Sequence, residues 1–380
     1  MAPVEVAEVV PDAIAWRRHL HANPELSFRE HRTAAFVRDR LSELGGLVLS
    51  SPTPTSVVAT LSGARAGPTL AMRADLDALP IQEESGVEFA SQVDGVMHAC
   101  GHDGHTAMLL ATARLLEERR EELAGEVRFV FQHAEELPPG GAVEIVRSGA
   151  LDGVDAVVGC HLMSDLDVGT VAVLDGACTA AADVFSVRIL GRGGHAAFPH
   201  MTVDPIAAAA QSVSSLQHLV ARETPPADPV VVSVTRISGG AADNVIPESV
   251  ELGGTVRTYT AELRRQTREA MERVLAGVTA AHRAGYEFEY IEGYSSVVND
   301  PSLAALVREV AATRLVDRPP LMAGEDFSAY QQVAPACFFF VGAGGDGAFP
   351  HHHPRFTIDE DALSVGVETL TATALRFLGA

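Results

Sequence analysis

Residues 69–77 read TLAMRADLD, a short and almost uninterrupted apolar segment that ends in Asp75 and Asp77. An apolar run of this length predicts a buried strand. Helical apolar spacing follows over about residues 106–122, and two earlier helices are predicted within residues 11–44. Because proline disfavours helix in the residue before it, we expect those two helices to be separated at Asn23-Pro24.

Further predicted strands also end in carboxylate or imidazole side chains. They are residues 126–132 before Glu135 and Glu136, residues 156–160 before His161, and residues 336–341 before His351, His352 and His353. Short apolar strands that alternate with helices are typical of a mostly parallel α/β sheet, which is covered on both faces. Ligands bind beyond the carboxyl ends of such strands, so we expect these side chains to collect there.

Residues 182–293 follow a different order, in which the predicted elements run β-α-β-β-α-β. This ferredoxin-like order makes a complete small domain by itself. Since the strand and histidine run of the first domain come after it, we predict an insertion. The expected domains are therefore a catalytic domain in two parts, residues 1–181 and 294–380, and an inserted domain, residues 182–293.

The composition excludes several classes of function. The 28 basic residues are all arginine, and 50 acidic residues give a net charge of −22. That charge argues against nucleic acid as a partner. Without lysine, neither a Schiff-base enzyme nor a Walker-type phosphate loop is available. The N-terminal segment lacks the pattern of a signal peptide and no apolar run is long enough to cross a membrane, so we expect a cytoplasmic protein without a membrane partner.

The segment 98–105, HACGHDGH, is the densest group of metal-binding residue types. Alternate side chains of an extended segment share a side, so His98, Cys100 and His102 can converge. Thiolate and imidazole groups together suit a transition-metal ion. The alternative is that these residues cap a helix and pack in the core.

The pair Glu135-Glu136 offers two carboxylates that point in different directions. One can bind a metal ion while its neighbour serves as a general base. A solvated acidic turn is the alternative. Likewise, His161 could be structural and the run of three histidines a surface loop, but both follow strands that should end near the other candidates.

Three residues of the predicted insertion are suited to contact substrate. His195 lies on a glycine-rich turn, and Asn244 and Arg257 offer donors that together match a carboxylate. Each could instead be an ordinary surface or turn residue.

The motifs as a set resemble one superfamily of enzymes. LHANPELSFRE, MRADLDALPIQE, MHACGHDGHTAMLL, FQHAEE, GRGGHAAFPH, ADNVIPE, GTVRT, MAGEDFSAY and HHHPRFTIDED occur in the expected order over nearly the whole chain. The chain resembles the metallo-aminoacylase and carboxypeptidase superfamily, in the branch of hippurate hydrolases, indole-acetyl-amino-acid hydrolases and N-acyl-amino-acid amidohydrolases. One departure is His133, where many relatives have proline.

The resemblance implies a role for each matching residue. Two divalent ions, Zn²⁺ or Mn²⁺ with Co²⁺ or Ni²⁺ as alternatives, would be bound by Cys100 as the bridge, His102, Glu136, His161 and one late histidine. We favour His352, which lies two residues before Pro354; His351 and His353 stay open. Glu135 would be the general base, His195 an oxyanion stabiliser, and Asn244 and Arg257 the ligands of the substrate carboxylate.

The resemblance further implies that the insertion is a lid and forms a homodimer, with its histidine reaching the partner's active site. The expected activity is hydrolysis of the amide bond of small N-acyl amino acids. A dipeptidase or carboxypeptidase on the same scaffold is the alternative within enzymology. Outside it, the alternatives are a non-catalytic metal-binding protein and an acidic scaffold without metal.

Overall fold

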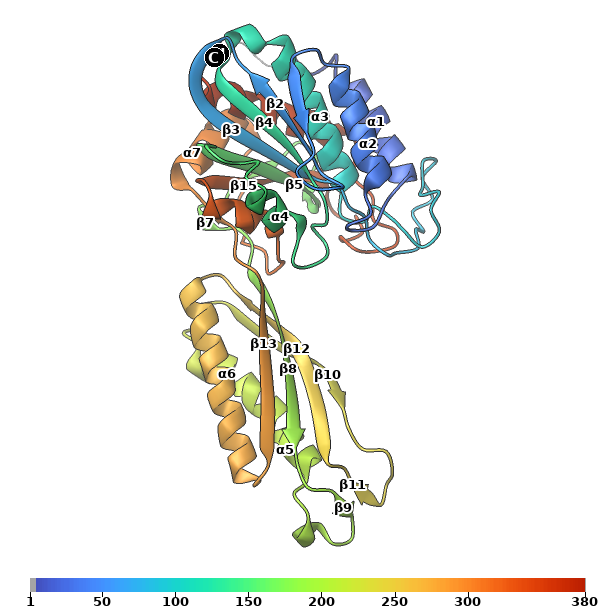
Figure 1. Cartoon of the computed structure of the whole chain (residues 1–380), viewed down its shortest axis with the longest axis vertical. Coiled ribbons are helices and arrows are strands. Elements are labelled where there is room, and N and C mark those ends of the chain that lie inside the picture. Colours follow the sequence, from blue (N-terminus) through green and yellow to red (C-terminus); the bar gives the residue numbers. More distant parts are fainter. Residues whose placement is uncertain (1–4, 380) are drawn as a thin grey trace. The chain divides into compact units, whose positions relative to one another are not determined.

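The computed structural model of the chain describes residues 5–379 (Figure 1). The chain divides into two compact units: unit 1 comprises residues 1–178, 297–319 and 326–380, and unit 2 comprises residues 179–296 and 320–325. These limits differ by three residues from each predicted junction, and residues 320–325 additionally join unit 2. The first four residues of the N-terminal segment, which entered the expectation of a cytoplasmic protein, lie outside the described residues.

Unit 1 is built around a seven-stranded sheet in the order β1-β2-β4-β3-β5-β15-β6. Its strands are β1 (Leu47–Ser50), β2 (Val57–Ser62), β3 (Arg65–Asp75), β4 (Ala124–Gln132), β5 (Ala156–Asp167), β6 (Val171–Ala172) and β15 (Ala336–Gly344). The central strands β4, β3, β5 and β15 run parallel, whereas β1, β2 and β6 are added antiparallel. The mostly parallel sheet is therefore confirmed, with antiparallel strands at both edges.

The central strands are apolar because helices and loops cover both faces of the sheet. In β3, Leu70, Ala71 and Met72 are all fully buried although successive side chains point to opposite faces. In β15, Phe339 belongs to the main core cluster, while the ring of Phe338 contacts Phe327 on the other face.

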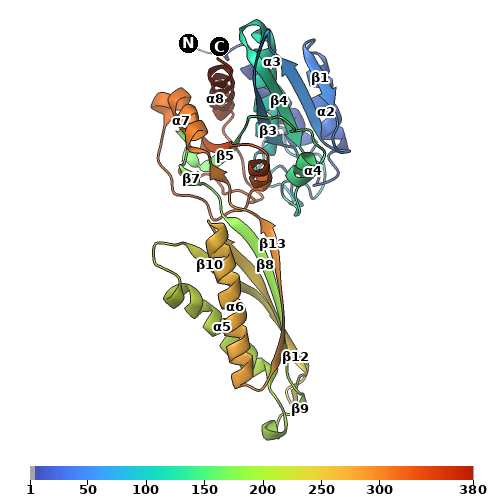
Figure 2. The ribbon, with the colours of Figure 1, turned by 60° about the vertical axis from the view of Figure 1, so that its left-hand side comes forward.

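Helices α1, α2, α3, α7 and α8 contact one another in one layer of unit 1 (Figure 2). Their bounds are α1 (Val10–Ala22), α2 (His31–Ser42), α3 (His102–Glu118), α7 (Pro301–Ala311) and α8 (Asp361–Phe377). The two predicted opening helices are thus confirmed, and α3 begins four residues earlier than predicted. Helix α4 (Gly141–Arg147) contacts β4 and the 3-10 segment Asp326–Gln332.

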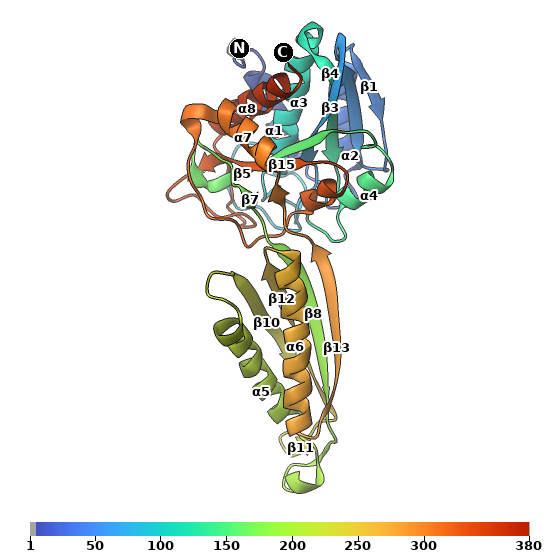
Figure 3. The same cartoon turned by 90° about the vertical axis from the view of Figure 1, so that its left-hand side faces the viewer.

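Unit 2 contains a four-stranded antiparallel sheet in the order β10-β12-β8-β13. Its elements are β8 (Ala181–Leu190), β9 (Gly194–His195), α5 (Pro205–His218), β10 (Val230–Ser238), β11 (Val245–Ile246), β12 (Ser249–Thr258), α6 (Ala261–Ala281) and β13 (Gly285–Tyr294). Helices α5 and α6 lie side by side on one face of this sheet (Figure 3). Both begin at a side-chain cap, because Asp204 and Thr260 accept backbone N–H groups of the first turn.

Among residues 5–379, no helix has the length and apolar composition needed to span a membrane.

Candidate metal centre and active site

The five predicted ligands of unit 1 meet at the ends of its central strands. The Sγ atom of Cys100 lies 3.5 Å from Nε2 of His161. The Oε1 atom of Glu136 lies 3.2 Å from Nε2 of His352 and 3.9 Å from Nε2 of His102. Two sets of three side chains, Cys100 with His102 and His161, and Cys100 with Glu136 and His352, each have their donor atoms within 4.8 Å of one another. Cys100 is therefore common to both sets.

Local backbone conformation brings the first two of these residues together. Gly101 has φ 93, a left-handed conformation that glycine adopts without strain, and helix α3 starts directly after it at His102. The turn sends the chain into the helix, so Cys100 ends the loop and His102 begins the first turn. The late loop is tied to the same place because the backbone N–H of His352 donates to the carbonyl of Ala99 at 2.8 Å.

Hydrogen bonds orient two of the imidazoles with Nε2 toward the site. Nδ1 of His102 donates to the carbonyl of Asp77 at 2.9 Å, and Nδ1 of His161 donates to the carbonyl of Leu162 at 2.8 Å. A carbonyl only accepts, so in the neutral form of each ring the hydrogen is on Nδ1 and Nε2 has the lone pair that a metal ion needs. Such outer contacts fix the tautomer of metal-binding histidines.

The donor atoms fit a cation chemically. In the described part of the chain, Nε2 of His102 and Oε1 of Glu136 are buried and have no hydrogen-bond partner. Unpaired buried polar atoms are rare and each calls for an explanation, of which a bound ion is one. Thiolate, imidazole and carboxylate donors together suit Zn²⁺ and other transition metals.

Of the three late histidines, only His352 has its ring in these sets. Nε2 of His351 donates to the carbonyl of Leu162 at 2.9 Å, and Nδ1 of His353 accepts the backbone N–H of Arg355 at 3.0 Å. The His353 ring also stacks on Phe349. Both rings are thus engaged elsewhere, while His352 is half exposed and faces Glu136.

The site is acidic, and this governs its protonation. Burial alone would lower the pKa of His102, but Asp75, Asp77 and Glu136 outweigh it and raise that pKa to about 10. Burial, followed by Glu136, Glu135 and Asp75, raises the pKa of the Cys100 thiol well above its ordinary value. Burial lowers the pKa of His161, which keeps its imidazole neutral. This excess of negative charge is what divalent cations would balance.

Three further residues belong to the site although no role was predicted for them. Asp75 and His105 form another close set with His102, and Nδ1 of His105 lies 2.7 Å from Oδ1 of Asp75. Asp77 accepts the backbone N–H groups of Glu135 and Glu136 at 3.0 Å each. The signals were present: both aspartates follow a predicted buried strand, and His105 lies three residues after His102, on the same side of a helix.

One predicted convergence is wrong. Within residues 5–379, His98 is in none of the close sets of donor atoms, and its ring instead lies beside that of His21, with centroids 6.4 Å apart. Alternation along an extended segment predicted that it would share a side with Cys100. The segment is not a regular strand there, because after the isolated bridge at Met97 it has no strand pairing and bends at Cys100.

In unit 2, His195 and Asn244 lie together. The short strands β9 and β11 pair His195 with Val245, and the carbonyl of Asn244 accepts the N–H of Ala196 at 3.0 Å. The backbone N–H of Ala197 donates to Nδ1 of His195, which leaves Nε2 of this exposed ring as the donor.

Arg257 lies elsewhere in unit 2, far from Asn244 of the same chain. It pairs with Ala182 near one end of β12, whereas β11 and β9 lie beyond the other end, where Ser249 pairs with Leu190 (Figure 1). Eight residues of strand span roughly 25 Å, too far for one carboxylate to contact both. Arg257 itself is held by bonds from Nη1 to Oγ1 of Thr255 and to the carbonyl of Val256.

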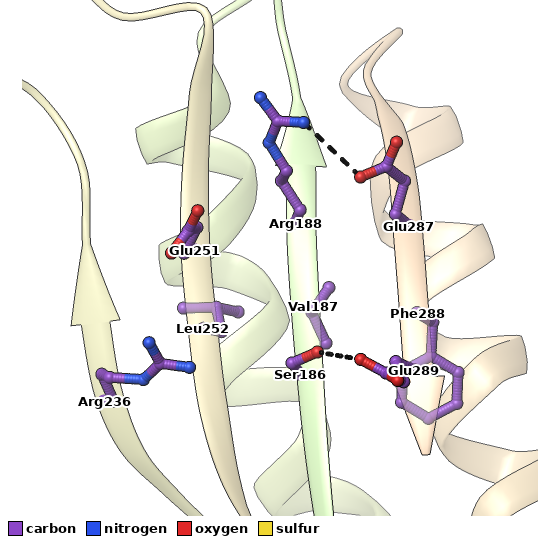
Figure 4. Close-up of a pocket in the computed structure, with 9 residues that line it drawn as sticks. All are labelled: Ser186, Val187, Arg188, Arg236, Glu251, Leu252, Glu287, Phe288 and Glu289. Atoms are coloured by element: carbon purple, nitrogen blue, oxygen red, sulfur yellow. Dashed lines mark hydrogen bonds and ion pairs between the residues drawn. The ribbon is translucent and has the colours of Figure 1, made fainter. Parts of the chain in front are cut away.

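The uncovered face of the unit 2 sheet forms a shallow hollow of ≈ 340 Å³ (Figure 4). Its lining includes the ion pair Arg188–Glu287 and the side chains of Arg236 and Glu251. None of the predicted site residues lines this hollow.

A mostly parallel α/β sheet with thiolate, imidazole and carboxylate donors gathered at its strand ends defines a candidate metal centre of the kind that metal-dependent hydrolases use. The model of peptidase family M20/M25/M40 matches residues 71–376. An N-acyl-L-amino acid amidohydrolase of Geobacillus stearothermophilus is 55% identical over 77% of this chain and 80% of its own. An N-acetylcysteine deacetylase of Bacillus subtilis is 44% identical over 96% of both chains.

The chain belongs to the M20/M25/M40 peptidase family, and it is a hydrolase of the amidohydrolase type. Among solved structures, it is similar to a dinuclear metal-binding peptidase of this family from Bacillus subtilis, with a TM-score of 0.88 and 40% identity. That likeness covers 98% of this chain and 99% of the other.

Proposed function

We propose that this amidohydrolase cleaves the amide bond of N-acyl amino acids with the help of two divalent ions. Cys100, His102, Glu136, His161 and His352 would hold the ions. The observation that carries the proposal is that Cys100 belongs to both sets of donor atoms, as a ligand shared by two ions must. The donors suit Zn²⁺ or Mn²⁺, with Co²⁺ and Ni²⁺ also compatible.

The ions, when bound, would make a water molecule acidic enough to attack at neutral pH and would polarise the amide carbonyl. Glu135 would accept the proton of that water. Its side chain is nearly buried, and a carboxylate oxygen lies within 4.8 Å of donor atoms of His102 and Glu136. Glu135 would then pass the proton to the leaving amine, so one carboxyl group serves as base and then as acid.

We propose that unit 2 is a ferredoxin-like lid and dimerisation domain, inserted into the catalytic domain. Its element order β-α-β-β-α-β supports the first part of this proposal. His195, with Nε2 as an exposed donor, would stabilise the oxyanion. Because Asn244 lies beside β9 and β11, beyond the end of β12 that is opposite to Arg257, we infer that the two residues bind one substrate carboxylate only if they come from different subunits of a homodimer.

A substrate panel combined with metal analysis tests the function. N-acetyl, N-benzoyl and N-aminoacyl amino acids are assayed before and after chelation, and metal content is measured by elemental analysis. We expect turnover of N-acyl amino acids, about two ions per subunit, and loss of activity on chelation that added metal restores. Turnover of unblocked dipeptides alone would instead support a dipeptidase, and bound metal without any turnover would support a binding protein.

A further inference from the structure

Two buried carboxylates bind three consecutive backbone N–H groups at the end of strand β4. The N–H of Ala134 donates to Oε1 of Glu30 at 2.8 Å. The next two, those of Glu135 and Glu136, donate to the two carboxylate oxygens of Asp77 at 3.0 Å each. Glu30 and Asp77 are essentially inaccessible to solvent, with 0% and 1% exposure. Asp77 therefore holds the backbone of the dipeptide that carries the proposed base and a proposed metal ligand, and Glu30 holds the residue directly before it.

Glu30 also holds backbone conformations that are otherwise unfavourable. The same Oε1 atom accepts the N–H of Phe28 at 2.9 Å. Phe28 has φ 64 and Ala134 has φ 50, left-handed values that are energetically unfavourable for a residue other than glycine. One carboxylate oxygen thus stabilises two strained residues from segments more than 100 positions apart.

The conformation of Ala134 matters because it directs the chain that follows. Because φ of Ala134 is positive, the chain turns sharply after β4. The carbonyl of Ala134 accepts the N–H of Gly141 at 3.0 Å. The turn sets the directions of the next two side chains. If Ala134 relaxed, both the Glu135 and Glu136 carboxylates would move relative to Cys100 and His102.

We propose that Glu30 is a positioning residue, whose carboxylate holds the turn at Ala134 and thereby sets the geometry of Glu135 and Glu136 for metal binding and catalysis. The inference rests on the proposed function for its catalytic part. Its metal-binding and backbone parts can be measured without turnover.

Three substitutions and one control test this role. Glu30→Gln keeps an acceptor oxygen at the same reach, Glu30→Asp keeps the charge but shortens the side chain by one methylene, and Glu30→Ala removes the acceptor. The control is Glu25→Ala. Glu25 lies in the same segment and accepts the N–H and Oγ1–H of Thr33, but has no hydrogen bond to residues 134–136 among those described. The Glu25→Ala variant therefore reports the effect of weakening the segment that contains Glu25 and Glu30 without removing the contact to Ala134.

We expect Glu30→Ala and Glu30→Asp to weaken metal binding by about 10- to 100-fold in calorimetric titration with Zn²⁺ or Mn²⁺, the range seen for outer contacts of metal ligands. Amide hydrogen exchange should accelerate at residues 134–136, and kcat should fall more than KM rises. Glu30→Gln should stay near wild type in all three measurements. Glu25→Ala should lower thermal stability without these changes.

Wild-type metal affinity and exchange in Glu30→Ala would overturn the proposal, as would equal losses in Glu25→Ala. If Glu30→Ala does not fold, the comparison of Glu30→Asp with Glu30→Gln decides. If wild type turns over no substrate of the panel, yet metal affinity and exchange change as expected, the proposed function fails while the positioning role stands.

Discussion

At the scale of single residues, Glu135 and Glu136 show how two adjacent carboxylates receive different environments. Glu136 faces His352 and His102, whereas Glu135 is nearly buried beside them. Removing the charge of Glu135 should leave the five proposed ligands intact. We expect Glu135→Gln to lower kcat by roughly 10²- to 10⁴-fold, the usual contribution of a general base, with unchanged metal content.

The measurement for Glu135→Gln is steady-state kinetics on the best N-acyl substrate, together with elemental analysis of the same preparation. Glu136→Gln serves as the comparison, because it should lose metal as well as activity. Retained activity in Glu135→Gln would refute its assignment as the base.

Glu30 should also leave a signature in the pH dependence of stability. Burial, with a further contribution from Asp77, raises its pKa from 4.5 to about 7. A carboxyl group whose pKa is raised by folding contributes stability that is fully present below pH 4.5 and is lost as the pH rises through about 7. Relative to Glu30→Gln, wild type should therefore lose of the order of 3 kcal/mol between pH 4.5 and pH 8.

Urea unfolding of both proteins across that range measures the difference. All other titratable groups are the same in the two proteins, so their contributions cancel in the difference between the two free energies of unfolding, and only the contribution of Glu30 remains. A difference in the free energy of unfolding that is independent of pH would contradict the raised pKa.

At the scale of elements, the first residue of α4, Gly141, packs so closely against the end of β4 that it has no space for a side chain. A Cβ atom at Gly141 would collide with the carbonyl oxygen of His133, which is backbone and cannot move away easily. We expect Gly141→Ala to destabilise the protein by about 3 kcal/mol or more. It should also impair metal binding, because the carbonyl of Ala134 bonds to this residue.

Gly277→Ala is the matched control, since Gly277 lies within helix α6 and nothing lies within 4 Å of its added Cβ. This substitution should stabilise the protein by about 0.5–1 kcal/mol, because alanine is more favourable than glycine inside a helix. Chemical denaturation of both variants measures the two effects. Equal effects of the two substitutions would contradict the close packing at Gly141.

At the scale of the whole molecule, the proposed dimer predicts that two inactive variants can complement each other. If His195 acts in the partner's active site, a mixed dimer of Glu135→Ala and His195→Ala subunits contains one site with both defects and one with neither. Random subunit exchange should then restore about a quarter of wild-type activity. Light scattering establishes the oligomeric state, and no recovery in mixed dimers would place His195 in the site of its own chain.

Most of the elements were predictable because their signals are local. Buried parallel strands such as β3 are continuous apolar runs, and the break between α1 and α2 follows from Asn23-Pro24. The antiparallel strands β1 and β2 and the helices α4, α7 and α8 were not predicted. For α4, the glycines at its start obscure the helical pattern, whereas β2 pairs with the distant strand β4 and the short strand β1 pairs in turn with β2.

For the site too, some features were predictable from the sequence and others were visible only in the structure. Residue types and order made Cys100, His102, Glu136 and His161 candidates, because thiolate, imidazole and carboxylate groups at strand ends are a chemical signal, and the family resemblance implied their roles as ligands. The same resemblance favoured His352, which lies two residues before Pro354. That its neighbours His351 and His353 are bonded elsewhere is visible only in the structure.

The sequence by itself determined which side chains are available for metal binding and proton transfer, and where the central buried strands and the opening helices lie, since both depend on residue type and near neighbours. Only the tertiary structure decided that His98 turns away, that Arg257 lies far from Asn244 of the same chain, and that Glu30 holds Ala134. These relations join residues through hydrogen bonds and strand register between distant segments. No local pattern encodes such distances.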